Sequence, residues 1–238
     1  SPWVRHHQNA VAGMASKVLA SVADRVFTAF PNVFKKGQWV GNPLRTAFTQ
    51  QLGPQERFAE RSGPLRLLVV GGSLGARALN EIVPQALALI PVAQRPVVVH
   101  QSGAAQIDAL RANYTAMGVA ADLTPFIDDT ASAYAAADII VCRSGASTVT
   151  EIAAVGAAAV FVPFPSAVDD HQTTNAQFLV QAGGGWLVQQ RDLSPESLAK
   201  MLLKLERPAL IDIALKAKTM QKTNATREVV TACEELAA

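Results

Sequence analysis

The fold is decided by residues 137–177, which read ADIIVCRSGASTVTEIAAVGAAAVFVPFPSAVDDHQTTNAQ. Two apolar runs, at residues 139–141 and 159–163, are each followed by polar residues and then by a helix-like segment. Apolar, β-branched runs bounded by turn residues are typical of buried parallel strands. The stretch therefore predicts two successive strand-to-helix turns at one edge of a parallel sheet. In open α/β sheets ligands bind at that edge, outside the carboxyl ends of the strands.

Strand-like and helix-like segments alternate along most of the remaining chain. Residues 65–70 form an apolar run, a glycine-rich turn follows at residues 71–75, and residues 76–90 carry apolar side chains three and four apart. This repeated order predicts a parallel sheet with helices on both faces, that is, a doubly wound α/β fold. Further strands are predicted at residues 22–30, 38–40, 97–100, 123–127 and 186–189, and further helices at residues 3–19, 107–117, 130–136, 149–155, 194–206, 211–220 and 225–237.

Composition excludes several classes of protein. The chain has 238 residues, half of them hydrophobic, and a formal net charge of +2, which suits one large or two small globular domains and gives no reason to expect a nucleic-acid partner. Cys142 and Cys233 are too few for a disulfide scaffold, so we expect a reducing, cytoplasmic setting. No signal peptide and no apolar run long enough to span a bilayer is visible.

The motifs exclude several chemistries. His6 and His7 would point about 100° apart on a helix, which argues against a shared metal. No Asp-x-Asp, P-loop or G-x-S-x-G pattern occurs, so neither a metal-held sugar diphosphate, nor an NTPase, nor acyl transfer is predicted. A dinucleotide site needs an acidic residue at the end of the strand after the glycine-rich turn, where this chain has His100 and Gln101.

Glu151 has two interpretations that the residues leave open. Thr148 to Glu151 fit a capping box, in which a glutamate at the third helical position bonds back to the cap. Alternatively, a carboxylate on the first helical turn accepts hydrogen bonds from a diol such as a ribose.

Other polar residues follow the same edge. Gln172 and Asn175 begin the next helix, where amide side chains can recognise sugar hydroxyls, although a polar helix start explains Asn175 better. The glycine-rich turn that carries Ser73 lets the backbone approach a ligand, and the helix after it presents N–H groups suited to a phosphate. Arg45 follows the turn at residues 41–43 and is either a solvated loop residue or a cation that faces an anionic ligand.

Several motifs, in this order, resemble those of the MurG family of bacterial glycosyltransferases. They are GNPLRT at residues 41–46, VGGSLGA at 70–76, FIDD at 126–129, CRSGA at 142–146, EI at 151–152 and FVPF at 161–164. MurG enzymes move N-acetylglucosamine from UDP onto lipid-linked muramyl-pentapeptide, converting lipid I to lipid II in peptidoglycan synthesis. The resemblance covers nearly the whole chain. It implies a GT-B fold, in which two Rossmann-like domains face each other across a cleft, and an inverting reaction without a metal or other cofactor.

The resemblance also implies roles for individual residues. Ile127 would contact the uracil through its backbone, and Glu151 would hold the ribose hydroxyls, which favours the second interpretation of that carboxylate. Gln172 would bind the hydroxyls of the N-acetylglucosamine, and Ser73 and Arg45 would lie on the diphosphate side of the cleft. The residues expected against the nucleotide and its diphosphate are Ala146, Ser147, Thr148, Val149 and Thr150.

The N-terminal segment departs from the family. Asn9 matches a donor-contacting asparagine in the family's His-Glu-Gln-Asn run, but His7 stands here in place of the acidic residue. The chain begins at Ser1 and lacks two features of the family's N-terminal domain: a glycine-rich loop with a histidine that helps to activate the acceptor, and a membrane-docking patch. We therefore expect the donor-binding part of a longer protein, with the catalytic base unidentified and supplied by the absent loop.

The expected organisation follows from the same resemblance. Residues 1–41 would be the remnant of the acceptor and membrane domain, residues 42–222 the UDP-sugar domain, and residues 223–238 a helix that returns to the N-terminal domain. The expected partners are UDP-N-acetylglucosamine, lipid I and the absent N-terminal domain, at the cytoplasmic face of the bacterial inner membrane. Two alternatives stay open: another GT-B enzyme, such as a lipid glucosyltransferase or a UDP-sugar epimerase, or a non-catalytic nucleotide-sugar-binding remnant.

Overall fold

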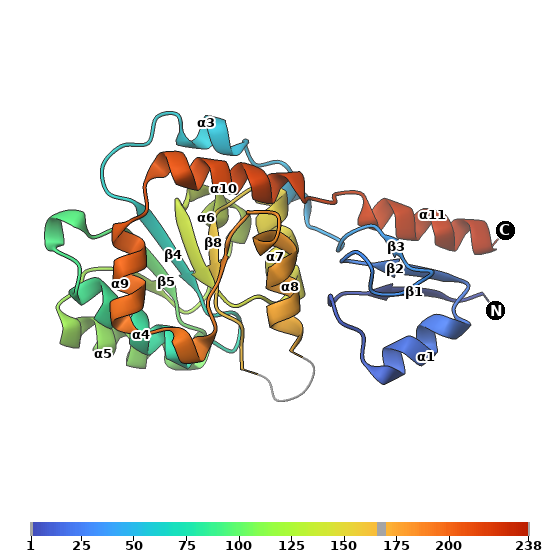
Figure 1. The fold of residues 1–238 in the computed structure, drawn as a ribbon, viewed down its shortest axis with the longest axis horizontal. Coiled ribbons are helices and arrows are strands. Elements are labelled where there is room, and N and C mark those ends of the chain that lie inside the picture. Colours follow the sequence, from blue (N-terminus) through green and yellow to red (C-terminus); the bar gives the residue numbers. More distant parts are fainter. Residues whose placement is uncertain (1, 166–169, 238) are drawn as a thin grey trace.

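A computed structural model of the chain, which describes residues 2–165 and 170–237, contains two parallel sheets side by side (Figure 1). The smaller sheet consists of β1 (Val4–His7), β2 (Arg25–Thr28) and β3 (Gln38–Trp39). The larger sheet consists of β4 (Arg66–Val70), β5 (Val97–Gln101), β6 (Asp122–Thr124), β7 (Ile139–Cys142), β8 (Ala159–Phe161) and β9 (Trp186–Leu187).

Helices connect the strands. They are α1 (Met14–Val22), α2 (Thr46–Thr49), α3 (Pro54–Phe58), α4 (Arg77–Ala88), α5 (Ile107–Met117), α6 (Thr130–Ala136), α7 (Ala146–Val155), α8 (His171–Val180), α9 (Pro195–Leu203), α10 (Arg207–Thr219) and α11 (Ala225–Ala237). Short 3-10 turns lie at Val92–Gln94, Ala104–Gln106 and Gln190–Asp192. No helix in the described ranges is both long enough and apolar enough to cross a membrane.

The larger sheet has the Rossmann strand order. Its strands run β6-β5-β4-β7-β8-β9, and every neighbouring pair is parallel. The first strand in the chain, β4, therefore lies inside the sheet, with later strands added on both sides of it. The doubly wound α/β fold predicted from the strand–turn–helix order is confirmed.

Both faces of this sheet are buried, and successive strand residues divide between them. Val69 and Val141 belong to a core shared with α4, α5 and α9, whereas Leu68 and Ile140 belong to a core shared with α6, α7 and α8. All four residues of β7 are buried, as expected for a central parallel strand covered on both sides. Gly156 ends α7 in the left-handed conformation with φ 71°, as its position predicted.

A buried ionic cluster holds the amino end of β7. The carboxylate of Asp138 is fully buried and lies 2.8 Å from Nη1 of Arg61 and 3.0 Å from Nη2 of Arg207. It also accepts the backbone N–H of Arg66 at 2.9 Å. Asp138 thereby joins three segments that are far apart in the sequence, at the amino ends of the strands.

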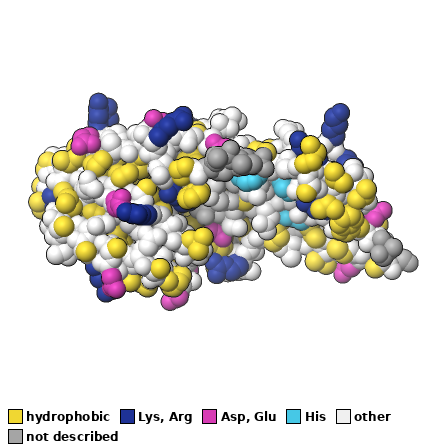
Figure 2. All heavy atoms as spheres, turned by 90° about the horizontal axis from the view of Figure 1, so that it is seen from below, with side chains coloured by type: hydrophobic (Ala, Val, Ile, Leu, Met, Phe, Trp, Pro, Cys, Tyr) yellow, Lys and Arg dark blue, Asp and Glu magenta, His cyan; other side chains and the backbone are white. Residues whose placement is uncertain are grey.

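The smaller sheet corrects one prediction. Residues 3–19 do not form a single helix, because residues 4–7 are strand β1, paired in parallel with β2, and the helix begins only at Met14. Pairing with a distant strand outweighs the local pattern here. Met14, Val18 and Val22 of α1 are exposed, and apolar side chains gather on this part of the surface (Figure 2).

Helix α11 packs on the smaller sheet although it follows the larger one in the chain (Figure 1). Ala225 and Ala232 of α11 share a small core with Phe27 and Val40. The two chain segments that connect the sheets touch each other, because a Cβ placed on Gly41 would lie 2.5 Å from Cβ of Lys222. The smaller sheet and α11 therefore form one body.

The two helices predicted at residues 194–206 and 211–220 are α9 and α10, and the break between them falls just before Pro208. Helix α10 begins at Arg207, earlier than predicted, with Pro208 in its first turn. A proline is tolerated there because the first N–H groups of a helix have no intrahelical acceptor.

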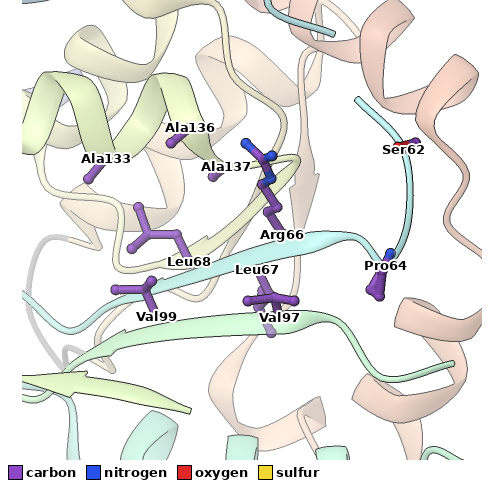
Figure 3. Close-up of a pocket in the computed structure, with 10 residues that line it drawn as sticks. All are labelled: Ser62, Pro64, Arg66, Leu67, Leu68, Val97, Val99, Ala133, Ala136 and Ala137. Atoms are coloured by element: carbon purple, nitrogen blue, oxygen red, sulfur yellow. The ribbon is translucent and has the colours of Figure 1, made fainter. Parts of the chain in front are cut away.

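An apolar hollow of about 330 Å³ lies toward the amino ends of β4 and β5, next to α6. Figure 3 shows Leu68 reaching toward Ala133 and Ala136 of α6, with Val97 and Val99 on the neighbouring strand. The described residues that line this hollow are mostly apolar and offer no group of polar side chains to a ligand, whereas polar residues gather at the other end of the strands.

Candidate functional site

The candidate site lies where the strand order of the larger sheet reverses, between β4 and β7. From β4 the chain continues toward β5, and from β7 it continues toward β8 on the other side. The turns that leave these two strands lie at the carboxyl edge of the sheet, which is where doubly wound sheets bind ligands. Ser73 lies on the first turn, and residues 146–150 open the helix after the second.

Helix α7 begins three residues earlier than the sequence suggested. Its first residue is Ala146 and its N-cap is Gly145, which has no side chain to cap the helix. Glu151 is therefore the sixth helical residue, and the capping-box interpretation is wrong. The prediction that its carboxylate lies on the first helical turn is also wrong, since it lies on the second. Because no side chain among the described residues caps α7, the first-turn N–H groups of Ala146, Ser147 and Thr148 are suited to bind an anion.

Two of the predicted α7 residues turn inward. The side chain of Val149 is fully buried in the core. Thr150 is also buried, donates to the carbonyl of Ala146 at 3.0 Å and accepts Nδ2 of Asn42 at 3.3 Å. Ser147 is exposed and Thr148 is half-buried, so these two present their side chains at the helix start.

Glu151 is a perturbed carboxyl group. Burial raises its pKa from 4.5 to about 7, and the nearby positive charge of Arg45 opposes part of that rise. The guanidinium of Arg45 lies over the ring of Phe48, 5.1 Å from its centroid. Perturbed carboxyl groups at a sheet edge are typical of functional sites, because structure alone rarely retains a group that burial disfavours.

Glu151 should make the stability of the protein depend on pH. Its folded-state pKa lies above its unfolded value, so its contribution to stability is greatest at low pH and is lost between about pH 4.5 and pH 7. We expect Glu151→Gln, which keeps the shape and removes the charge, to gain up to about 3 kcal/mol over the wild type at pH 8. Urea unfolding from pH 5 to pH 8 measures this, and a difference that does not change with pH would contradict the assignment.

Gln172 is held by its carbonyl oxygen. The backbone N–H groups of Phe164 and Ser144 donate to Oε1 at 2.8 and 3.3 Å. Only the oxygen of an amide can accept these bonds, so the side chain must offer its two N–H donors to other partners. Gln172 therefore connects the ends of β7 and β8 and is oriented as a donor.

Asn9 is joined to the larger sheet by Asn175. The fully buried amide of Asn175 accepts the N–H of Ala10 at 2.8 Å and donates to Oδ1 of Asn9 at 3.2 Å. It also donates to the carbonyl of Ser144 at 3.2 Å. The prediction that Asn175 is merely a polar helix start is wrong, because the residue ties the N-terminal segment to the candidate site.

The turn after β6 carries Ile127. Ile127 is partly buried against the core, and its carbonyl accepts Oγ1 of Thr130 at 3.4 Å. Asp129 is the N-cap of α6, and hydrogen bonds from Ser132 to its carboxylate lower its pKa. The carbonyl of Pro125, two residues before Ile127, accepts a hydrogen bond from Nε2 of Gln101 at 3.0 Å.

The structure brings the predicted residues together in three groups. The positive charge of Arg45 acts on Glu151, Gln172 lies against the Ser144 turn, and Asn9 reaches the same turn through Asn175. The contacts among described residues place Arg45 near Glu151 and include none between Arg45 and Ser73. Gln101, which the sequence alone presents only as evidence against NAD, binds the turn that carries Ser73. Its position at the end of the strand next to that turn is the sequence feature that indicates this contact.

The histidines of the N-terminal segment bind backbone carbonyl groups. Nε2 of His6 lies 2.8 Å from the carbonyl oxygen of Gly41, and Nε2 of His7 lies 3.0 Å from that of Val11. On a strand the two rings point to opposite faces of the sheet. Histidine side chains gather near the junction of the two bodies (Figure 2), and the described residues contain no cluster of three or more potential metal ligands.

Comparison with known proteins gives consistent results. Residues 66–234 match the model of the glycosyltransferase family 28 C-terminal domain. A protein of Paracidovorax citrulli is 76% identical over 237 residues, which cover 100% of this chain and 67% of the relative. A protein of Polaromonas naphthalenivorans is 74% identical and is covered to 66%. Both are named UDP-N-acetylglucosamine–N-acetylmuramyl-(pentapeptide) pyrophosphoryl-undecaprenol N-acetylglucosamine transferase.

Solved structures agree with this. The crystal structure of Acinetobacter baumannii MurG superposes with a TM-score of 0.89 at 41% identity and covers 98% of this chain and 67% of that one. Anabaena HepE, crystallised with UDP and glucose, has a TM-score of 0.62 at 14% identity, a likeness that concerns the fold alone. The chain thus spans about two thirds of the length of its relatives. It belongs to the MurG family of glycosyltransferases and has the GT-B fold, and residues 66–234 are the family 28 C-terminal domain.

Proposed function

We propose that this chain binds UDP-N-acetylglucosamine as the donor-binding part of a transferase that converts lipid I to lipid II. The observation that carries the proposal is the constellation at the reversal of strand order. The start of α7 and, one turn further on, the perturbed carboxyl of Glu151 follow β7, and the donor-oriented amide of Gln172 is bonded to the turn that joins β7 to α7. The names of the relatives, which specify donor and acceptor, support the same substrates.

Each group suits one part of the donor. Glu151 accepts hydrogen bonds from the ribose hydroxyls, and Ile127 contacts the uracil through its backbone. The N–H groups at the start of α7 and on the Ser73 turn face the diphosphate, where helix N-termini stabilise negative charge. Gln172 donates to hydroxyl oxygens of the sugar, and Asn9 approaches the donor from the N-terminal segment.

These groups also suit the departure of UDP. The acceptor hydroxyl attacks the anomeric carbon with inversion and gives its proton to the base expected in the acceptor half. The bond to the diphosphate oxygen breaks, and negative charge grows on the diphosphate. The N–H groups at the start of α7, with Arg45 nearby as a cation, stabilise that charge as it develops. Because the acceptor is lipid-linked, the complete protein would act at the cytoplasmic face of the bacterial inner membrane.

We also propose domain boundaries on this basis. Residues 1–41 and the helix from residue 223 belong to the body that would carry the acceptor half. Residues 42–222 would form the donor domain. The packing of α11 on the smaller sheet supports placing that helix with residues 1–41.

The test is calorimetry with UDP, UDP-N-acetylglucosamine and UDP-glucose. We expect the wild-type chain to bind all three, with UDP-N-acetylglucosamine tightest. In Gln172→Glu the carboxylate keeps both accepted N–H bonds but loses the donors, so the affinity for UDP-N-acetylglucosamine relative to UDP should fall about 10-fold, as for one lost hydrogen bond.

Gln181→Glu is the matched control, since it adds the same charge at the far, exposed end of α8. This control should leave the ratio of the affinities for UDP-N-acetylglucosamine and UDP unchanged. A preference for UDP-glucose would favour another GT-B enzyme, and failure to bind any of the three ligands would refute the donor-site proposal.

A further inference from the structure

The glycine-rich turn after β4 depends on other parts of the chain for its shape. Gly72 and Gly75 have φ values of +85° and +76°, and Leu74 is 90% exposed, so the turn has little packing of its own. Its internal bond runs from the N–H of Gly75 to the carbonyl of Gly72 at 3.0 Å. A turn of this composition is expected to sample several conformations unless neighbouring groups hold it.

Gln101 holds one side of the turn. Its Oε1 accepts the N–H of Gly72 at 3.1 Å, and its Nε2 donates to the carbonyl of the same residue at 3.0 Å. The same Nε2 donates to Pro125, which precedes the Phe126–Ile127 pair. One buried amide therefore fixes the turn of Ser73 and the turn of Ile127 relative to each other.

Gln106 holds the other side of the turn at the end of a chain of hydrogen bonds that leads into the buried interior. Its Nε2 donates to the carbonyl of Leu74 at 3.0 Å, and its Oε1 accepts Nδ2 of Asn80 at 2.8 Å. Oδ1 of Asn80 lies 2.9 Å from Nε2 of His100, and Nδ1 of His100 lies 2.8 Å from the hydroxyl of Tyr114.

The direction of every bond in this chain follows from the carbonyl of Leu74. A carbonyl only accepts, so the nitrogen of Gln106 faces it and the oxygen faces Asn80. Asn80 must then accept from a protonated Nε2 of His100, whose Nδ1 accepts from Tyr114. Burial lowers the pKa of His100 to about 3, which keeps the ring in this neutral form.

The neighbouring turn prevents the glycine-rich turn from shifting. A Cβ placed on Gly103 would lie 2.6 Å from the nitrogen of Gly75, and one placed on Gly75 would lie 2.2 Å from the carbonyl oxygen of Ser102. The two turns thus pack backbone against backbone. None of the hydrogen bonds among the described residues uses the N–H groups of Ser73 and Leu74, which the two glutamines hold in place.

We propose that Gln101 and Gln106 are positioning residues that hold the N–H groups of Ser73 and Leu74 toward the diphosphate of the nucleotide. The buried Asn80–His100–Tyr114 chain orients Gln106 for this task. The inference rests on the proposed function as far as the ligand is concerned. The positioning of the turn itself stands on the contacts above.

Gln106→Met is the first test, because Gln106 is half-buried and methionine keeps its length while removing both bonds. We expect the affinity for UDP to fall about 10-fold while the affinity for uridine, which lacks the diphosphate, stays within 2-fold. In the unliganded protein, amide hydrogen exchange at Gly75 should accelerate at least about 10-fold, because the turn is released.

Two control variants separate positioning from a general loss of stability. Gln85→Met makes the same exchange at an exposed site on α4, and Val83→Ala removes core volume from that helix without touching the turn. Both should keep the ratio of UDP to uridine affinity, although Val83→Ala lowers the melting temperature.

The outcomes are distinct. Unchanged exchange at Gly75 in Gln106→Met overturns the positioning role whether or not nucleotides bind. Equal weakening of UDP and uridine overturns the role toward the diphosphate. A wild-type chain that binds neither ligand refutes the proposed function, and with it the ligand part of the inference, while the exchange measurement still decides whether Gln106 holds the turn.

Discussion

In the Glu151→Ala variant, the affinity for UDP is expected to fall by about 100-fold. Hydrogen bonds to a charged acceptor contribute roughly 1.5–3 kcal/mol each, and a carboxylate that accepts from two ribose hydroxyls loses both when it is truncated. The fold should survive, since Glu151 is a partly buried group whose raised pKa shows that burial disfavours its charge. Titration calorimetry with UDP, together with a melting curve, measures both effects.

The matched control for this variant is Glu81→Ala. Glu81 is an exposed helical glutamate in the same domain, paired with Arg77 at 2.8 Å on the surface of α4. Its removal should leave UDP affinity unchanged. If Glu151→Ala binds UDP as tightly as the wild type does, the carboxylate does not hold the ribose, and the donor site must be placed elsewhere along the sheet edge.

The Asp138→Ala variant is expected to lose about 3–5 kcal/mol of unfolding free energy, the usual cost of removing one partner from a buried ion pair. The substitution would leave the guanidinium groups of Arg61 and Arg207 without their carboxylate, and these side chains are only 8% and 16% exposed. It would also leave the N–H of Arg66 without its acceptor. Urea denaturation of the purified chain measures the loss.

Asp192→Ala provides the comparison for a surface pair. Asp192 lies 3.9 Å from Arg191, and both side chains are largely exposed, so its removal should cost less than about 1 kcal/mol. Similar losses in the two variants would show that the Asp138 cluster does not stabilise the fold beyond a surface interaction. Because the cluster lies at the opposite end of the strands, UDP affinity should change little in the folded fraction of Asp138→Ala.

Sequence patterns predicted the larger sheet well and the helix starts less well. The apolar runs that became β4, β5 and β7 were placed within a residue or two, because a strand buried on both faces needs continuous apolar side chains. The start of α7 was misplaced because Thr148 looked like a cap, whereas Gly145 takes that position without a side chain. Capping residues are optional, so a threonine near a helix start does not locate that start.

The smaller sheet shows the opposite case. Residues 4–7 have no strand pattern of their own, and the sequence predicted helix there. They become a strand because β2 lies alongside and supplies the backbone partners. A short polar segment of this kind takes the conformation that its neighbours complete, and its neighbours are 21 residues away in the chain.

The amino-acid sequence by itself determined the class of the fold, the succession of strands and helices in the larger sheet, and the family motifs. These features depend on the local succession of apolar and polar residues along the chain. Only the tertiary structure decided which polar groups come together: the charge of Arg45 acts on Glu151, Phe164 and Ser144 donate to the oxygen of Gln172, and Ala10 donates to Asn175 across 165 residues. The strand order brings these groups together, and strand order is settled by the packing of whole helices on the sheet, not by any pattern within one segment.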